Sequence, residues 1–169
     1  MDPWSRTLTP DEQRLVVRAE AHAFDLYAGV HTPHRSCGIA LAETFGLVTR
    51  PYQALRKGGL TGLGPCGAIV AGRLVLGEVL GDPDPAGGVT DVLREAVGWY
   101  DAQIRVRMDR GTAAGDSTVC NVLTGQFTEF RSAPRHDFCT ALAATVAQTV
   151  AEALIRADAL PALPPPLQT

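Results

Sequence analysis

The chain has 169 residues, of which 46% are hydrophobic and 20% are charged, and its formal net charge is −3. This length predicts a single domain whose core is large enough to fold without added cross-links. The small negative charge gives no basic footprint for nucleic acid, so we expect no nucleic-acid partner.

The composition also bears on the compartment. We expect no membrane-spanning segment, because no apolar stretch approaches the roughly 20 residues that cross a bilayer. The first residues, MDPWSRTLTPDEQ, have neither a basic start nor an apolar run and do not resemble a secretory signal. These features predict a cytoplasmic protein, where structural disulfides are uncommon, so the four cysteines need another explanation.

Helix start and stop signals divide the chain into segments. The first is a capping box, in which Thr9 precedes Pro10 and Glu12 closes the box, and the helical spacing of apolar residues continues to Gly29. Similar signals predict helices over 33–46, 65–80, 90–110, 117–124 and 133–157, with a short helical turn over 50–56. We therefore expect an all-α fold of six to seven helices in one compact domain, residues 1–159. An extended, mobile, Pro-rich tail is predicted over 160–169.

A glycine-rich loop leads into the helix that we expect at the centre of the fold. Its sequence from Lys57 is KGGLTGLGPCGAIVAG. Gly64 is expected to cap the helix, Pro65 to occupy the first helical position and Cys66 to lie in the first turn. Free N–H groups and the helix dipole favour a thiolate there, which predicts a lowered pKa for Cys66. A tight turn and close helix packing explain the same glycines without a functional site.

The four cysteines share a position in their predicted helices. Cys37, Cys66, Cys120 and Cys139 each fall in a first or second turn, and no two form a Cys-x-x-Cys pair of the zinc or thioredoxin type. If the four helix N-termini converge, they form an anion-stabilising pocket that suits a thiolate-ligated cluster or reactive thiols. Alternatively, the cysteines fill the core as small hydrophobic residues.

Four blocks carry these cysteines: HRSCGIALAETFGL, GGLTGLGPCGAIVAGRLVLG, STVCNVLTG and HDFCTALAATVAQTVAEAL. In order and surroundings they resemble the C-GCAxxG-C-C family, small bacterial and archaeal proteins regarded as redox-active, over about residues 10–157. A similar domain occurs in split-Soret cytochrome c, where an iron–sulfur centre is implied. The resemblance implies one site made by the four cysteines, with Gly67 and Ala68 as the small pair after the second. The glycine that ends the family's central motif is Ala71 here, and no Cys-x-x-Cys-His haem attachment motif is present.

Several residues near the cysteines are secondary candidates. His31, His34 and His136 are either auxiliary metal ligands and proton donors or ordinary helix-start side chains. Arg73 either supports a thiolate or a bound anion, or forms an ion pair, and an ion pair is the simpler explanation of Glu78 as well.

Assembly is predicted from small and aromatic residues. The glycine- and alanine-rich helix faces, together with Trp99 and Tyr100 on a long helix, predict a homodimer with a helical interface. The same residues serve equally as anchors of the core within one chain.

Three functional hypotheses follow. The first is a redox protein in which an iron–sulfur cluster serves electron transfer or redox sensing with an unidentified partner protein. Its cofactor-binding residues are Cys37, Cys66, Cys120, Cys139, Gly64 and Gly67, and the four cysteines are the metal ligands. The second is a thiol–disulfide protein with Cys66 as the catalytic nucleophile. The third is a helical dimeric assembly module whose cysteines are only structural.

Overall fold

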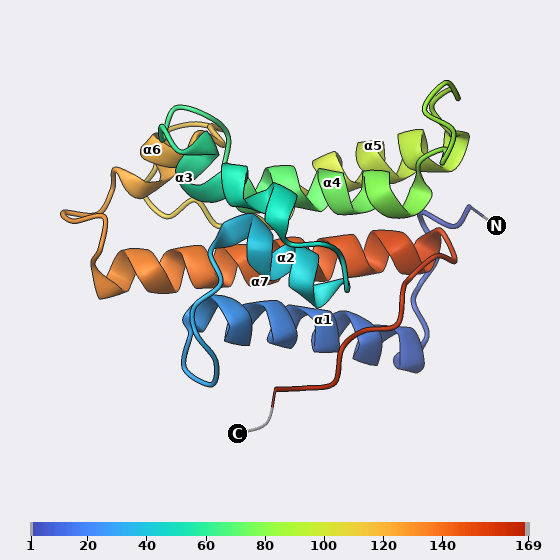
Figure 1. Ribbon diagram of the computed structural model, residues 1–169, viewed down its shortest axis with the longest axis horizontal. Coiled ribbons are helices and arrows are strands. Elements are labelled where there is room, and N and C mark those ends of the chain that lie inside the picture. The colour runs from blue at the N-terminus through green and yellow to red at the C-terminus, as the bar shows by residue number, and fades with distance from the viewer. Residues whose placement is uncertain (1, 168–169) are drawn as a thin grey trace.

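The computed structural model describes residues 2–167, and the regular structure within them is entirely helical (Figure 1). The elements are α1 (Pro10–Ala28), α2 (Cys37–Thr44), the 3-10 helix η1 (Arg50–Leu55), α3 (Arg56–Gly59), α4 (Gly67–Leu80), α5 (Asp91–Arg107), α6 (Cys120–Thr124) and α7 (Ala133–Arg156). For this part of the chain, the predicted all-α class and number of helices are confirmed. The 3-10 helix lies where the sequence predicts a short helical turn.

Two helices occupy the middle of the fold. Helix α7 lies between α1 and α4 and also packs against α2 and α5 (Figure 1). Helix α4 contacts α2, α3, α5, α7 and η1, so the glycine-rich loop does lead into a central helix. This arrangement places the start of α4 among several other chain segments.

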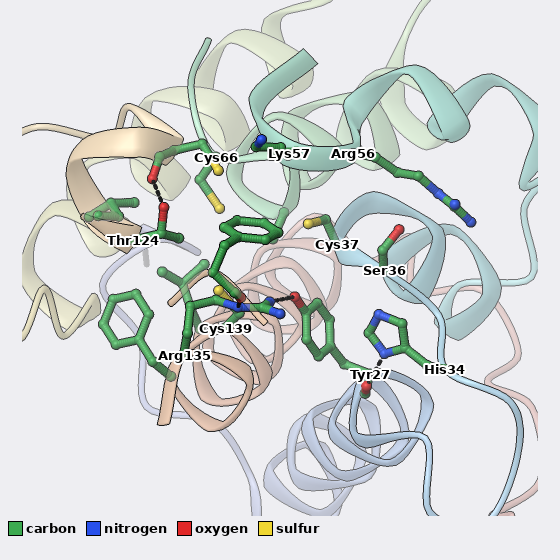
Figure 2. Close-up of a pocket in the computed structure, with 17 residues that line it drawn as sticks. Tyr27, His34, Ser36, Cys37, Arg56, Lys57, Cys66, Thr124, Arg135 and Cys139 are labelled. Carbon is green, nitrogen blue, oxygen red and sulfur yellow. Dashed lines mark hydrogen bonds between the residues drawn. The ribbon is translucent and has the colours of Figure 1, made fainter. Parts of the chain in front are cut away.

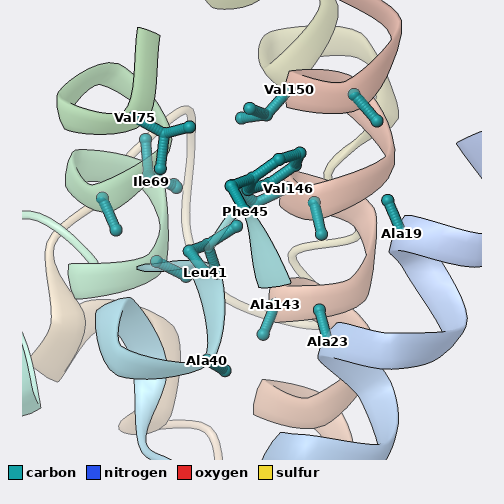
Figure 3. Close-up of a cluster of buried hydrophobic side chains, with 14 of the residues drawn as sticks. Ala19, Ala23, Ala40, Leu41, Phe45, Ile69, Val75, Ala143, Val146 and Val150 are labelled. Atoms are coloured by element: carbon teal, nitrogen blue, oxygen red, sulfur yellow. The ribbon is translucent and has the colours of Figure 1, made fainter. Parts of the chain in front are cut away.

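The core lies where α1, α2, α4 and α7 meet (Figure 3). Ala19 and Ala23 of α1 and Ala143 of α7 are fully buried, and such small side chains let two helices lie close together. Leu41 in α2 and Phe45 just after it fill the adjoining space, and each is no more than 1% exposed to solvent. Burying a side chain of this size stabilises the fold by about 1.5–3 kcal/mol.

Helices α1 and α7 begin where their caps predict. The Thr9 hydroxyl accepts a hydrogen bond from the Glu12 N–H (3.3 Å), and a Glu12 carboxylate oxygen accepts one from the Thr9 N–H (2.7 Å). At the start of α7 the Ser132 hydroxyl accepts a hydrogen bond from the Arg135 N–H (3.4 Å). The first helix ends before Gly29, whose φ of 73° is left-handed and therefore suits glycine.

Two other predicted boundaries are wrong. Helix α2 begins at Cys37 instead of residue 33, because the preceding residues lie across the end of α1, where the Arg35 N–H donates to the Leu26 carbonyl (2.8 Å). Helix α5 ends at Arg107 instead of near residue 110, because Met108 adopts an extended conformation and turns into the core.

Helix α7 also corrects the expectation that no stretch is long and apolar enough to cross a membrane. Its 24 residues satisfy that criterion, but 67% of its apolar window is buried inside the protein. A helix that is covered on most sides by other helices has the same composition. This single candidate is therefore not enough to make the chain a membrane protein.

The Pro-rich tail has no regular secondary structure over residues 160–167 and lies against α1. The Arg18 guanidinium donates to the backbone carbonyls of Leu163 (2.9 Å) and Pro164. The side chains of Leu160, Leu163 and Leu167 pack against the core. Residues 168–169 lie outside the described part, and the mobility of the tail stays a prediction.

Trp99 and Tyr100 make their contacts within the chain. Tyr100 is fully buried, and its hydroxyl donates to the Ile69 carbonyl of α4 (2.8 Å). Trp99 packs against Trp4 with ring centroids 6.1 Å apart, and its indole N–H donates to the Trp4 carbonyl (3.1 Å). These contacts agree with the anchoring role within one core.

We expect Tyr100→Phe to lower the free energy of unfolding by about 1 kcal/mol, because it removes one buried hydrogen bond and almost no volume. Urea denaturation of the two proteins measures the difference. An unchanged free energy of unfolding would show that the bond to Ile69 contributes nothing.

Candidate functional site

All four cysteines line one cavity of about 180 Å³. Cys37 begins α2, Cys66 directly precedes α4, Cys120 begins α6 and Cys139 lies in the second turn of α7. Figure 2 shows Cys37, Cys66 and Cys139 pointing into the same space. All four are free thiols. The cysteines therefore converge, and a scattered placement in separate parts of the core is excluded.

Backbone pairing between the glycine loop and the start of α6 fixes two of the cysteines. The Cys66 N–H donates to the Thr118 carbonyl (2.7 Å), and the Cys120 N–H donates to the Gly64 carbonyl (3.0 Å). A Cβ atom at Gly58 would lie 2.6 Å from the Cβ of Cys120, so the loop approaches α6 as closely as a glycine allows. The glycines thus bring the Cys66 and Cys120 backbones together.

The same pairing explains why two helices begin later than predicted. Pro65 forms an antiparallel bridge with Val119, which requires an extended backbone on both sides. Helix α4 consequently starts at Gly67 with Cys66 as its capping residue, and the predicted cap at Gly64 is wrong. Residues 117–119, predicted to be helical, lie outside α6, and Val119 has an extended backbone for the same reason.

Close packing of α2 against α4 places the third cysteine. A Cβ atom at Gly38 would lie 3.1 Å from the Ala71 Cβ and 2.9 Å from a Leu55 methyl group. Gly38 directly follows Cys37, so this contact brings the Cys37 thiol to the start of α4. Ala71, which stands where the family motif has glycine, is fully buried and still permits the close approach.

The side chains that line the cavity include three cations, Arg56, Lys57 and Arg135, and no carboxylate. Arg135 is held in place by the Tyr27 hydroxyl, to which its guanidinium donates at 3.3 Å (Figure 2). Tyr27 is itself only 3% exposed. This lining favours a negatively charged group in the cavity.

Burial raises the pKa of three thiols. The pKa of Cys37 rises to about 11, and those of Cys66 and Cys120 also rise. At Cys66 the backbone N–H groups of Ile69 and Ala68 favour the thiolate, but desolvation outweighs them, and the Cys37 thiol adds to the increase. The predicted lowering of the Cys66 pKa is therefore wrong.

The raised pKa of Cys37 predicts that the metal-free protein loses stability in alkali. Between about pH 8.5 and 11 the unfolded chain releases this proton while the folded chain keeps it, so the free energy of unfolding falls by up to about 1.4 kcal/mol per pH unit. We expect Cys37→Ser to lose less stability than wild type over this window in urea titrations. The other titrating groups are common to both proteins. Equal losses of stability would therefore show that the Cys37 thiol does not cause the loss in alkali.

The secondary histidine candidates differ in position. His34 lines the cavity, and its Nδ1 is hydrogen-bonded to the Tyr27 carbonyl. His136 bonds the Ala28 carbonyl through Nε2 (3.1 Å), with its ring 5.3 Å from that of His34. His31 does not line the cavity. Each of the two neighbouring histidines thus uses one ring nitrogen in a backbone contact.

The two charged candidates have partners away from the thiols. Arg73 forms an ion pair with Asp101 (2.9 Å), so the simpler of its two explanations is correct. Glu78 accepts a hydrogen bond from the Tyr52 hydroxyl (2.8 Å) and forms no ion pair with any described residue. Neither residue lines the cavity.

No ready-made site for a single ion is present in residues 2–167, since no group of three or more histidine, cysteine or carboxylate side chains is placed to hold one. Sequence reasoning also missed several cavity residues, among them Tyr27, Phe130 and Arg135. These three come from α1, from the loop before α7 and from α7 itself. No local pattern distinguishes them from ordinary helix and loop residues.

Fold and site together define an all-helical protein with a four-cysteine cavity. No protein-family model, curated protein or solved structure matches the chain. The resemblance of the four sequence blocks to the C-GCAxxG-C-C family therefore stays a prediction.

Proposed function

We propose that the chain is a cytoplasmic redox protein that holds an iron–sulfur cluster between Cys37, Cys66, Cys120 and Cys139. The observation that carries this proposal is the convergence of four free thiols, from four different elements, on one cavity. The function is one-electron transfer or redox sensing, because a bound cluster supplies a reversible one-electron couple. The resemblance of the four cysteine blocks to a family regarded as redox-active supports the same conclusion.

The cavity suits a group larger than one ion. Its volume of about 180 Å³ is several times the roughly 30 Å³ that one water takes up in the liquid. A single tetrahedral ion requires sulfur atoms about 3.8 Å apart, given metal–sulfur bonds of about 2.3 Å. Iron–sulfur clusters are commonly held by four cysteine thiolates, and four cysteines line this cavity.

Residues of the chain can stabilise the negative charge of such a group. Lys57 and Arg135 bring positive charge to the cavity, and the N–H groups of Ala68 and Ile69 point at the Cys66 sulfur. The four thiols must lose their protons on binding. Binding is therefore expected to be tighter at higher pH.

The thiol–disulfide alternative is disfavoured by the raised pKa of the thiols. The raised pKa of Cys66 keeps its thiol protonated near neutral pH, which makes it a poor nucleophile, because the thiolate is the attacking species. The assembly-module alternative leaves the cavity itself unexplained. Cysteines that only pack fill space, whereas these four border an open volume together with three cations.

Iron and sulfide analysis after anaerobic purification, or after reconstitution with ferrous iron and sulfide, tests the proposal. We expect a brown protein with broad visible absorption and with iron and acid-labile sulfide bound in comparable amounts. Colourless protein with four titratable thiols after reconstitution would contradict it.

The homodimer stays a prediction. Tyr100 and Trp99, which suggested it, make their contacts within one chain. The mass from light scattering at micromolar concentration decides the question, and a mass of one chain counts against the dimer.

A further inference from the structure

The mouth of the cysteine cavity is positively charged although the chain as a whole carries −3. Arg56, Lys57 and Arg135 form no ion pair with any described residue, whereas seven ion pairs occur elsewhere in residues 2–167. Arg135 and Lys57 both lie over the ring of Phe130, at 4.5 Å and 5.1 Å from its centroid. The positive charge is thus held in place by the loop before α7.

Exposed apolar side chains accompany these cations. Leu60 and Leu63, on the glycine loop that follows Lys57, are 64% and 74% exposed, and Phe130 is 40% exposed. Leu60 has a φ of 71° and Lys57 a φ of 49°, a left-handed conformation that costs a non-glycine residue about 1–2 kcal/mol. Backbone strain of this kind concentrates at functional sites, and here it presents a cation and a leucine beside the cavity.

We propose that this surface, which we call the rim (Arg56, Lys57, Leu60, Leu63, Phe130 and Arg135), docks a small acidic one-electron carrier protein. The inference rests on the proposed function. One electron passes from the reduced carrier to the oxidised cluster, so the carrier is oxidised and the cluster reduced by one electron, and no atom is transferred. The four cysteines line the same cavity as Arg56, Lys57, Phe130 and Arg135, so a cluster that they held would lie close to the rim.

Charge and apolar area together select a protein as the occupant. Opposite charge steers association and sets orientation, which suits a transient electron-transfer complex with a small interface. A small anion uses only the cations, whereas the exposed leucines gain contact only from another large surface. The glycine loop, α3 and α6 gather at one end of the molecule, where a partner has free access (Figure 1).

Calorimetric titration with an acidic plant-type ferredoxin tests the rim in both the metal-free and the cluster-loaded protein. The rim variants are Arg56→Glu, which Figure 2 shows extending away from the thiols, and Leu63→Glu. The control is Arg94→Glu, an equal change of charge at an exposed position near the start of α5, away from this end of the molecule. We expect each rim variant, and an increase of salt from about 20 to 300 mM, to weaken binding about tenfold or more. The control is expected to bind like wild type.

Stopped-flow reduction of the loaded protein adds a functional measurement. The rate with reduced ferredoxin is expected to fall in Leu63→Glu, whose side chain is exposed and does not line the cavity, while its rate with photoreduced deazalumiflavin, an uncharged small reductant, stays unchanged. Equal ferredoxin binding by rim and control variants overturns the docking inference, as does binding to anionic phosphatidylserine vesicles in place of the carrier. Failure to load iron and sulfide overturns the proposed function instead, and the titration of metal-free protein still reports on the rim.

Discussion

Replacing Cys66 by serine is expected to abolish iron and sulfide binding while leaving the fold in place. A neutral hydroxyl is a much poorer ligand for iron–sulfur clusters than a thiolate, so the site loses one of its four attachment points. Stability is expected to change by less than about 1 kcal/mol, because serine is a favourable helix-capping residue and the Cys66 N–H bond to Thr118 is unaffected. Iron and sulfide per chain, visible absorption and the thermal midpoint are the three measurements.

The matched control is Met108→Leu, which replaces a buried sulfur-containing side chain that does not line the cavity. It is expected to bind as much iron as wild type. In metal-free wild type we also expect Cys66 to alkylate slowly at neutral pH, because its thiol is protonated there. A Cys66→Ser protein with unchanged iron content and thiol reactivity would refute both active roles and leave only packing.

Local signals in the sequence predict much of this fold. The capping box at Thr9 and Glu12 and the Ser132 cap each involve residues within one turn, so their hydrogen bonds can be read from spacing alone. The two longest helices, α1 and α7, accordingly begin where predicted. The position of each cysteine near a helix start is local information of the same kind.

Contacts between distant segments explain where the predictions fail. Pro65 is a good first helical residue in isolation, but its pairing with Val119 keeps it extended. No pattern near either residue indicates this bridge. The prediction that Cys66 ionises readily fails for a related reason. It is based on the helix N-terminus, which is a local feature, whereas the burial that raises the pKa of Cys66 comes from the packing of several elements.

The candidate site was therefore only half predictable. Convergence of the cysteines could be proposed because their helix starts and the sequence resemblance point to the same four residues. The surrounding chemistry could not, because Tyr27 and Arg135 are separated by most of the chain and meet only through the packing of α1 against α7. Their contact places a hydrogen-bonded guanidinium at the cavity, and no sequence motif predicts it.

The second large effect is expected at Gly67, the first residue of α4. A Cβ atom there would lie 2.1 Å from the Leu55 carbonyl oxygen, which belongs to rigid backbone at the end of η1. Gly67→Ala therefore forces η1 and the start of α4 apart, at a cost of about 1–3 kcal/mol or more. Because Arg56 and Lys57 directly follow Leu55, the cavity is expected to open and the iron content to fall as well.

Gly77→Ala provides the matched control on the same helix. No atom lies within 4 Å of a Cβ at Gly77, so alanine there is expected to stabilise the protein by about 0.5–1 kcal/mol through its higher helix propensity. Thermal midpoints of the metal-free proteins should consequently move in opposite directions, by about 2–4 °C per kcal/mol. If both substitutions shift the midpoint equally, the close approach of Gly67 to Leu55 does not limit stability. A loss of iron in Gly67→Ala without loss of fold would instead place the role of this glycine in the geometry of the cysteine cavity.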